Sequence, residues 1–447
     1  MEVDKIKPVV IATIALVVGL VIGIGAGWVA KPAEVITGPG VTATATTTKT
    51  VTVTPPVAGG LSGEVKIGWI DGLTGAGAFW GEQGLAVARV AVEDVNQYLQ
   101  KANAGWWLTL VVEDSETKPE VALEKLKSLH ARGITIVGGI DFSADLKAMM
   151  SYANTNHILI VAAANSYELA IENDYIFRVL PNTGFEGRSL ATLLREEGVK
   201  YHIPVWRGDA YADSVITKLR EYCANFGIEV DDGIRYNPDA VEFSAEAGEL
   251  NSKVQTAISK YGADKVSWNL LSFEEGKAFY AALKPYNPVG WGIKWLFQDG
   301  GVLCDWVIED PSIAEMNANA KAIYADHRPE VGLRAKLVQE KVVEKLGRTA
   351  DIYGLCCYDT VWLITFGLLG AGRYDATAVK DFMPMAFDMN SSIIGWAPMD
   401  KYGDKAGGDM GYYQVVKIGE EYKWARVGGW RFSTDTVFWL PEPEIVS

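Results

Sequence analysis

Between residues 63 and 99, the spacing of the apolar positions changes from that of a strand to that of a helix. Val65, Ile67 and Trp69 alternate with other residues, as in a strand. Farther along, apolar residues recur at the spacing of a helix face: Leu85, Ala88, Val92, Val95 and Leu99. The glycines between them let the chain bend at low steric cost: Gly72, Gly75, Gly77 and Gly81. We therefore predict a strand, a turn and a helix, and backbone N–H groups at the helix start favour an anion.

Strand-like and helix-like runs then alternate along the chain in two consecutive sets. The first set predicts strands at 65–70, 107–113, 134–137, 158–162 and 176–179. The second set predicts strands at 201–206, near 228, at 266–271 and at 293–297. Pro119 and Ser143 are expected to open the helices after the second and third strands, and Pro204 predicts an edge strand or a bulge.

This alternation predicts an α/β fold with two doubly wound parallel-sheet lobes joined by a hinge. Ligands of open parallel sheets bind beyond the carboxyl ends of the strands. Two such sheets that face each other are therefore expected to hold one ligand in the cleft between them.

An apolar run without charged residues precedes the lobes. Residues 9–30 are long enough, at about 1.5 Å per helical residue, to cross the hydrocarbon core of a bilayer. Residues 31–62 are rich in Thr, Val, Pro and Gly and lack the large apolar residues of a core, as in an extracellular stalk. We expect residues 1–8 in the cytoplasm, an uncleaved single-pass transmembrane helix and lobes on the extracellular side. A cleaved secretory signal is the alternative.

Composition and charge narrow the function classes. The 41 basic and 56 acidic residues give a formal charge of −15, which argues against binding to nucleic acids. The four histidines stand in no catalytic motif, and no complete phosphate-loop or dinucleotide fingerprint is present. We therefore predict a protein that is not an enzyme and needs no cofactor.

The four cysteines have no CxxC spacing, so no zinc site is expected: Cys223, Cys304, Cys356 and Cys357. Two alternatives remain open for them. Cys304 forms a disulfide with Cys356 or Cys357, or the cysteines are buried free thiols.

Eight motifs follow one another along the chain. They are LTGAGAFWG at 73–81, VEDSETKPEVALEKL at 112–126, VGG at 137–139, AAANSYEL at 162–169, YIFRVLP at 175–181, FSAEAGELNSKV at 243–254, FQDGG at 297–301 and YDTVWL at 358–363. In order and spacing the chain resembles, from about Glu64 to about Val416, the branched-chain amino-acid (Leu/Ile/Val-type) substrate-binding proteins of ABC transporters, a group of type I periplasmic binding proteins. The resemblance implies a first lobe from 63–183 and 312–393, a second lobe from 184–311 and 394–432, and a C-terminal tail at 433–447.

The resemblance also implies a set of ligand contacts. Trp80 and Tyr353 form the apolar wall, and Asp299 binds the α-ammonium group. Hydroxyl, amide and backbone donors for the α-carboxylate come from Ser143, Ala163, Ala164 and Asn165. Leu271 and Ser272 approach from the second lobe.

Two departures from the family pattern bear on the ligand. Asp141, Phe142 and Ser143 stand where the family often has a small hydroxyl residue, and Asn165 replaces a usual threonine. If Asp141 faces the cleft, its charge repels a carboxylate and favours a larger, amine-bearing or amide ligand. If it does not, Asp141 is a solvated acid at a helix start.

Together these features predict a membrane-anchored extracellular receptor of an ABC importer. It captures an amino acid or a related small amine or amide and delivers it to a permease. The alternative is a surface-layer or sensory protein that keeps the receptor fold for assembly or signalling.

Overall fold

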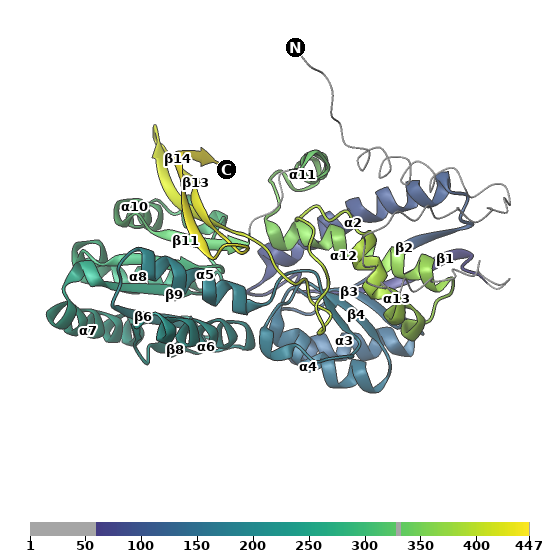
Figure 1. Cartoon of the computed structure of the whole chain (residues 1–447), viewed down its shortest axis with the longest axis horizontal. Coiled ribbons are helices and arrows are strands. Elements are labelled where there is room, and N and C mark those ends of the chain that lie inside the picture. Colours follow the sequence, from purple (N-terminus) through teal and green to yellow (C-terminus); the bar gives the residue numbers. More distant parts are fainter. Residues whose placement is uncertain (1–59, 328–331, 447) are drawn as a thin grey trace, which may run out of the picture. The chain divides into compact units, whose positions relative to one another are not determined.

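A computed structural model describes residues 60–327 and 332–446 (Figure 1). The predicted N-terminus at 1–8, the transmembrane helix at 9–30 and the stalk as far as residue 59 lie outside the described residues.

The first lobe is built on a five-stranded parallel sheet in the order β2-β1-β3-β4-β5. Its strands are β1 (Gly63–Asp71), β2 (Trp106–Asp114), β3 (Ile136–Gly139), β4 (Leu159–Ala162) and β5 (Ile176–Arg178). Its helices are α2 (Ala78–Lys101), α3 (Pro119–Ala131), α4 (Ser143–Thr155), α12 (Ile352–Ala371) and α13 (Ala376–Met389). Helices α3 and α4 pack together, while α12 packs on α2 and α13 (Figure 1).

The second lobe contains nine strands in the order β14-β13-β12-β11-β10-β9-β6-β7, with β8 paired to β6. They are β6 (Tyr201–Arg207), β7 (Glu229–Val230), β8 (Ile234–Tyr236), β9 (Val266–Leu271), β10 (Lys294–Gln298), β11 (Ile323–His327), β12 (Met410–Ile418), β13 (Glu421–Arg431) and β14 (Thr436–Ile445). The strands are parallel from β7 to β11, and β12, β13 and β14 continue the sheet in antiparallel pairs. The predicted two-lobe α/β fold is therefore confirmed.

Helices of the second lobe follow these strands. They are α5 (Thr183–Glu196), α6 (Ala210–Asn225), α7 (Ser244–Tyr261), α8 (Gly276–Leu283), α9 (Asp305–Glu309) and α10 (Pro311–Ala320). Helix α11 (Leu333–Leu346) packs on α2 of the first lobe. Short 3-10 turns are η1 (Tyr167–Leu169), η2 (Ala263–Lys265), η3 (Lys284–Tyr286) and η4 (Pro288–Trp291).

Two of the expected boundaries are wrong. Residues 312–327 were expected in the first lobe, but β11 lies between β10 and β12 in the second sheet and α10 packs on β12. The segment 433–447 was expected to be a tail, but its strand β14 pairs with β13 from Arg426 to Arg431. Both segments complete sheet edges that would otherwise leave backbone groups unpaired.

The structure also tests the expected helix starts at Pro119 and Ser143 and the expected role of Pro204 in its strand. Pro119 opens α3, as predicted, whereas Phe142 is the N-cap of α4 and Ser143 is its first residue. Pro204 lies neither at an edge nor in a bulge. It sits in β6 between the part that pairs with β7 and the part that pairs with β8, where a residue without an N–H group interrupts pairing at little cost.

Within the described residues, one helix is long and apolar enough to cross a membrane. This helix is α12, but it is almost entirely buried inside the protein. Its apolar character therefore matches that of a core helix with neighbours on all sides.

Candidate ligand cleft

A cavity of about 500 Å³ is lined by residues of both lobes. Trp80 and Phe142 come from the first lobe, Tyr211 and Phe273 come from the second, and Tyr353 comes from the start of α12. Phe142 follows the carboxyl end of β3, and Phe273 follows that of β9, as expected for open parallel sheets.

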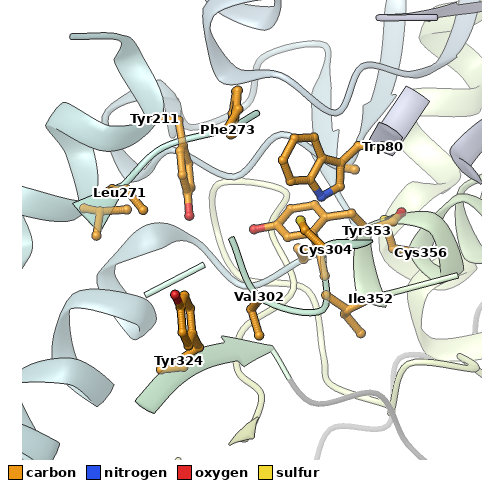
Figure 2. Packing of buried hydrophobic residues seen from close by; sticks show 14 of the residues in the cluster. Trp80, Tyr211, Leu271, Phe273, Val302, Cys304, Tyr324, Ile352, Tyr353 and Cys356 are labelled. Atoms are coloured by element: carbon orange, nitrogen blue, oxygen red, sulfur yellow. Dashed lines mark hydrogen bonds between the residues drawn. The ribbon is translucent and has the colours of Figure 1, made fainter. Parts of the chain in front are cut away.

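Aromatic rings from the two lobes meet at this cavity. The Trp80 ring centroid lies 4.8 Å from that of Phe273, and the Phe142 centroid lies 5.8 Å from it. The Arg207 guanidinium group stacks on Phe273, 3.8 Å from the ring centroid. Figure 2 shows Trp80 beside Tyr353, with Tyr211 on the other side of the view. Phe273 was missed because the prediction ended at Leu271 and Ser272, which are buried and do not line the cavity.

Asp299 lines the cavity and belongs to a cluster of buried carboxyl and hydroxyl groups. The Tyr211 hydroxyl group lies 2.8 Å from Glu186 Oε2 and 3.1 Å from Asp299 Oδ2. Burial raises the pKa of Asp299 to about 7, and the charge of Glu186 acts in the same direction. Asp299 Oδ1 accepts a hydrogen bond from the Gly300 N–H group, whereas Asp299 Oδ2 shares the single Tyr211 proton with Glu186 Oε2.

Asp141 and Asp145 line another part of the cavity, which we call the acidic wall. They are only 8% and 2% exposed, so Asp141 is not the solvated acid of the alternative interpretation. Asp71 lies behind them, 1% exposed. Burial raises the pKa of Asp71 and of Asp145 to about 7 and that of Asp141 well above its usual value, and Asp71 adds to the effect on Asp141.

The donors expected for a ligand carboxylate are mostly used within the protein. The backbone N–H groups of Ala163 and Ala164 donate to Gly139 and Ile140, and neither residue lines the cavity. The amide Nδ2 of Asn165 donates to the Pro181 carbonyl group and to Glu186 Oε1, each at 2.9 Å. These donors therefore already have partners within the protein, and their role in binding a ligand carboxylate stays a prediction.

Ser143 and Asn165 both line the cavity. The hydroxyl oxygen of Ser143 accepts a long hydrogen bond from the Ser166 N–H group at 3.3 Å. Of the predicted site residues, those brought together around the cavity are Trp80, Asp141, Phe142, Ser143, Asn165, Asp299 and Tyr353.

The glycine-rich turn after β1 binds an anion that the protein itself supplies. Asp114 Oδ1 accepts hydrogen bonds from the N–H groups of Leu73 at 3.0 Å, Thr74 at 3.2 Å and Glu116 at 2.8 Å. The Gly77 N–H group donates to the Thr117 hydroxyl oxygen at 3.1 Å. The prediction of an anion-binding turn thus fits, but the anion is a side chain and not the ligand.

The turn also needs its glycines for close contacts. Gly75 has φ +85°, and a Cβ atom on Gly77 would lie 2.1 Å from Phe142 Cζ. The turn therefore fixes Phe142, which lines the cavity.

The two basic residues that line the cavity are paired with acids. Lys118 Nζ lies 2.8 Å from Glu116, and Arg207 binds both Asp209 and Glu275. In all, seven acidic residues line the cavity against these two basic ones: Glu116, Glu120, Asp141, Asp145, Asp209, Asp239 and Asp299.

The four cysteines all lie in the described residues and are free thiols, so the expected disulfide is not formed. The sulfur of Cys356 lies 2.9 Å from the Tyr353 carbonyl oxygen, and that of Cys357 lies 3.8 Å from Asp141 Oδ1. Cys304 Sγ is directed to the Gly300 carbonyl oxygen at 3.9 Å. Cys357 Sγ also lies 3.5 Å from the Tyr353 carbonyl oxygen, so the two adjacent thiols share this acceptor. Residues 60–327 and 332–446 contain no group of three or more His, Cys, Asp or Glu side chains that could hold a metal ion.

Comparisons with solved structures place this fold among the type I periplasmic binding proteins. The leucine-binding protein of Thermotoga maritima has a TM-score of 0.67 at 17% identity, over 80% of this chain and 97% of its own. The branched-chain amino acid transporter substrate-binding protein of Streptococcus pneumoniae, solved with isoleucine, has a TM-score of 0.65 at 15% identity, over 86% and 99%. A solute-binding protein of an ABC transporter from Rhodopseudomonas palustris, solved with 3,4-dihydroxybenzoic acid, has a TM-score of 0.66 at 15% identity, over 84% and 96%.

Sequence comparison extends over most of the chain. An uncharacterized protein of Methanocaldococcus jannaschii is 24% identical over 407 residues, which are 86% of this chain and 94% of the relative. The family model described as periplasmic binding protein matches residues 64–416. This protein therefore belongs to the periplasmic binding protein family, whose members bind solutes and are not enzymes.

Proposed function

We propose that this protein is the solute-binding receptor of an ABC importer and that it captures an amino acid or a related small amine or amide in the cleft. The observation that carries the proposal is the position of Asp299, 5% exposed, in the wall of a cavity with aromatic sides. No side chain among the described residues forms an ion pair with Asp299, so an ammonium group of a ligand would supply the missing charge.

The relatives support this class of function without fixing the ligand. Solved proteins of the same fold carry leucine, isoleucine or an aromatic acid, according to their names. The acids of this cleft favour the amine-bearing alternatives over an aromatic acid, because a carboxylate would lie near Asp141 and Asp145.

The attachment is part of the same proposal. Residues 9–30 form a single-pass anchor, and residues 31–62 form a flexible extracellular tether. A tether of about 30 residues has an end-to-end distance of roughly 30 Å, which keeps the lobes close to a permease. This retention raises the effective concentration of the receptor at its transporter.

A thermal-shift screen of the full chain in detergent tests the function. Its ligand classes are amino acids, amides, amines, diamines and aromatic acids. A ligand that binds only the folded protein adds roughly 2.7 kcal/mol of stability at 100 times its dissociation constant. We expect stabilisation by amine-bearing compounds, and a screen in which no class stabilises the protein would contradict the receptor function.

The Asp299→Asn variant tests the polar anchor. Loss of one partner of a buried charge pair costs roughly 2–5 kcal/mol, so the affinity for the best amine ligand should fall at least about thirtyfold. The matched control is Asp239→Asn, which removes an exposed acid at the rim of the same cavity. Equal affinities of Asp299→Asn and the control would return Asp299 to the role of a turn residue.

A further inference from the structure

We propose that the ligand is an organic dication, a short aliphatic diamine or polyamine, with one ammonium group at Asp299 and a second at the acidic wall of Asp141 and Asp145. This inference rests on the proposed receptor function and names its ligand class. It differs from an amino-acid receptor because both ends of the ligand are positively charged.

The acidic wall has acceptor oxygens that nothing in the described chain satisfies. Asp141 Oδ2 and Asp145 Oδ1 are buried and have no hydrogen-bond partner among residues 60–327 and 332–446. The same holds for Asp71 Oδ2 directly behind them. A buried carboxylate oxygen without a donor costs free energy, and an ammonium group carries three donors and the opposite charge.

The unpaired oxygens of Asp71 and Asp141 lie close together beside Gly84 of α2. A Cβ atom at Gly84 would lie 3.1 Å from Asp71 Oδ2, 3.2 Å from Asp141 Oδ2 and 3.1 Å from Cys357 Sγ, so the helix backbone and the two carboxyl groups are closely packed here. Two buried carboxyl oxygens without donors thus meet behind the cavity wall, and a positive charge in the cavity beside Asp141 would offset the repulsion between them.

The cleft offers little to a ligand carboxylate. The N–H groups of the glycine-rich turn bind Asp114, and those of Ala163 and Ala164 bind strand carbonyl groups. The lining bases Lys118 and Arg207 already have acidic partners. A zwitterion would therefore bring its negative end to a site whose described donors are mostly occupied and whose walls are acidic.

The aromatic lining of the cavity suits the hydrocarbon part of a diamine. The rings of Trp80 and Phe142 both contact Phe273 and form one aromatic surface in the cavity that Asp299, Asp141 and Asp145 also line. Such rings pack on methylene groups and attract an adjacent ammonium group through their faces. Tyr211 and Tyr353 also line the cavity, and the Tyr211 hydroxyl group contacts Asp299 at 3.1 Å (Figure 2).

Isothermal titration calorimetry on the full chain in detergent tests the proposal. The probes are 1,3-diaminopropane, putrescine, cadaverine and spermidine, compared with n-butylamine and leucine. We expect at least one diamine or polyamine to bind at least about thirtyfold more tightly than either n-butylamine or leucine. The length of the best diamine would report the distance between the two acidic regions.

The Asp141→Asn variant separates the two ends of the ligand. It should lower the affinity for the best diamine at least about thirtyfold while changing the affinity for n-butylamine less than about threefold. The control Asp232→Asn, at an exposed acid that does not line the cavity, should change neither affinity. If Asp141→Asn does not fold, as judged by circular dichroism, the wild-type comparison of diamine with monoamine still decides.

The outcomes distinguish this inference from the function beneath it. Leucine could instead bind most tightly of all probes, with this binding lost in Asp299→Asn and unchanged in Asp141→Asn. That result would overturn the proposal of a dicationic ligand and leave the receptor function standing. If no probe binds in calorimetry but another ligand class stabilises the protein in the thermal screen, only the proposal of a dicationic ligand is overturned. Failure of all ligand classes in both experiments would overturn the receptor function as well.

Discussion

Asp114 and Thr74 lie 40 residues apart in sequence, yet the Thr74 hydroxyl group donates to Asp114 Oδ2 at 2.7 Å and its N–H group donates to Oδ1 at 3.2 Å. This pair joins the end of β2 to the glycine-rich turn after β1. The turn is thereby held in shape by an internal carboxylate.

We predict that Asp114→Ala lowers the free energy of unfolding by about 1–3 kcal/mol at pH 7, because it removes charge-assisted hydrogen bonds to several donors. Partial burial raises the pKa of Asp114, but the hydrogen bonds from Thr74 and neighbouring N–H groups outweigh it, and the pKa is lowered overall. A lowered pKa means that this stabilisation is present above the unfolded-state pKa near 4 and is lost as the pH falls through the folded-state value.

Urea unfolding followed by circular dichroism measures this effect at pH 7 and pH 3. The control is Asp232→Ala, an exposed acid. Equal stability of the Asp114 and Asp232 variants at pH 7 would contradict the structural role of Asp114.

We predict that Gly77→Ala disturbs the cleft as well as the turn. The new Cβ atom would lie 2.1 Å from Phe142 Cζ, so the ring must move. Forced repacking of this kind costs about 1–3 kcal/mol. Because Phe142 lines the cavity, ligand affinity should fall together with thermal stability.

The matched control for this variant is Gly332→Ala. A Cβ atom at Gly332 meets nothing within 4 Å. Thermal unfolding with and without ligand measures both effects. Equal melting temperatures and equal stabilisation by ligand in Gly77→Ala and Gly332→Ala would refute the prediction.

We predict that the ligand-free protein is more stable at pH 5.5 than at pH 8. Burial raises the pKa values of Asp71, Asp145 and Asp299 to about 7, whereas they are near 4 in the unfolded chain. Between these values the folded state binds more protons than the unfolded state, so the stability contribution is complete below the unfolded-state pKa and is lost as the pH rises through 7. One such group changes the unfolding free energy by about 2 kcal/mol between pH 8 and pH 5.5.

Urea unfolding at several pH values measures this slope. Asp299→Asn should flatten this slope, because it removes one of the acids whose pKa is raised. A stability that rises from pH 5.5 to 8 would show that the acids of the cleft are ionised at little cost in the free protein.

We predict that the mature protein keeps residues 9–30 and remains in the membrane, because this run has spanning length and the stalk lacks a core. Intact-mass analysis of protein purified from native membranes measures the N-terminus. A mature N-terminus near Trp28 or Lys31, with the protein free in the medium, would establish a cleaved secretory signal.

Local pattern was sufficient to predict the strands of the first lobe, because alternation such as Val65, Ile67 and Trp69 reports burial directly. It was not sufficient to place β11, whose five buried residues could have completed either sheet. That choice depends on pairing with β12, which comes more than 80 residues later. The β14 strand was missed for a related reason: prolines and acids conceal an edge strand that only β13 can order.

The cleft shows the same division. The aromatic and acidic residues of the site were found from motif position, including Trp80, Phe142 and Asp299. The sequence could not predict which hydrogen-bond donors remain free for a ligand. Their availability depends on partners distant in sequence, such as Asp114 for the glycine-rich turn and Glu186 for Asn165. Motif position therefore placed seven of the predicted site residues at the cavity, whereas the internal partners of the expected donors depend on the tertiary structure.

Helix α12 carries one acid in its apolar middle, Asp359, which accepts hydrogen bonds from the Ser392 hydroxyl group and the Ile393 N–H group at its two oxygens. An exported chain meets the translocon before it folds, and a segment of this length and composition is a candidate for lateral transfer into lipid. A central aspartate opposes that transfer by about 2.5–3.5 kcal/mol on the biological insertion scale. On the extracellular location proposed above, Asp359 would oppose retention of α12 in the bilayer during export. In the folded lobe, Asp359 ties residues 392–393 to α12.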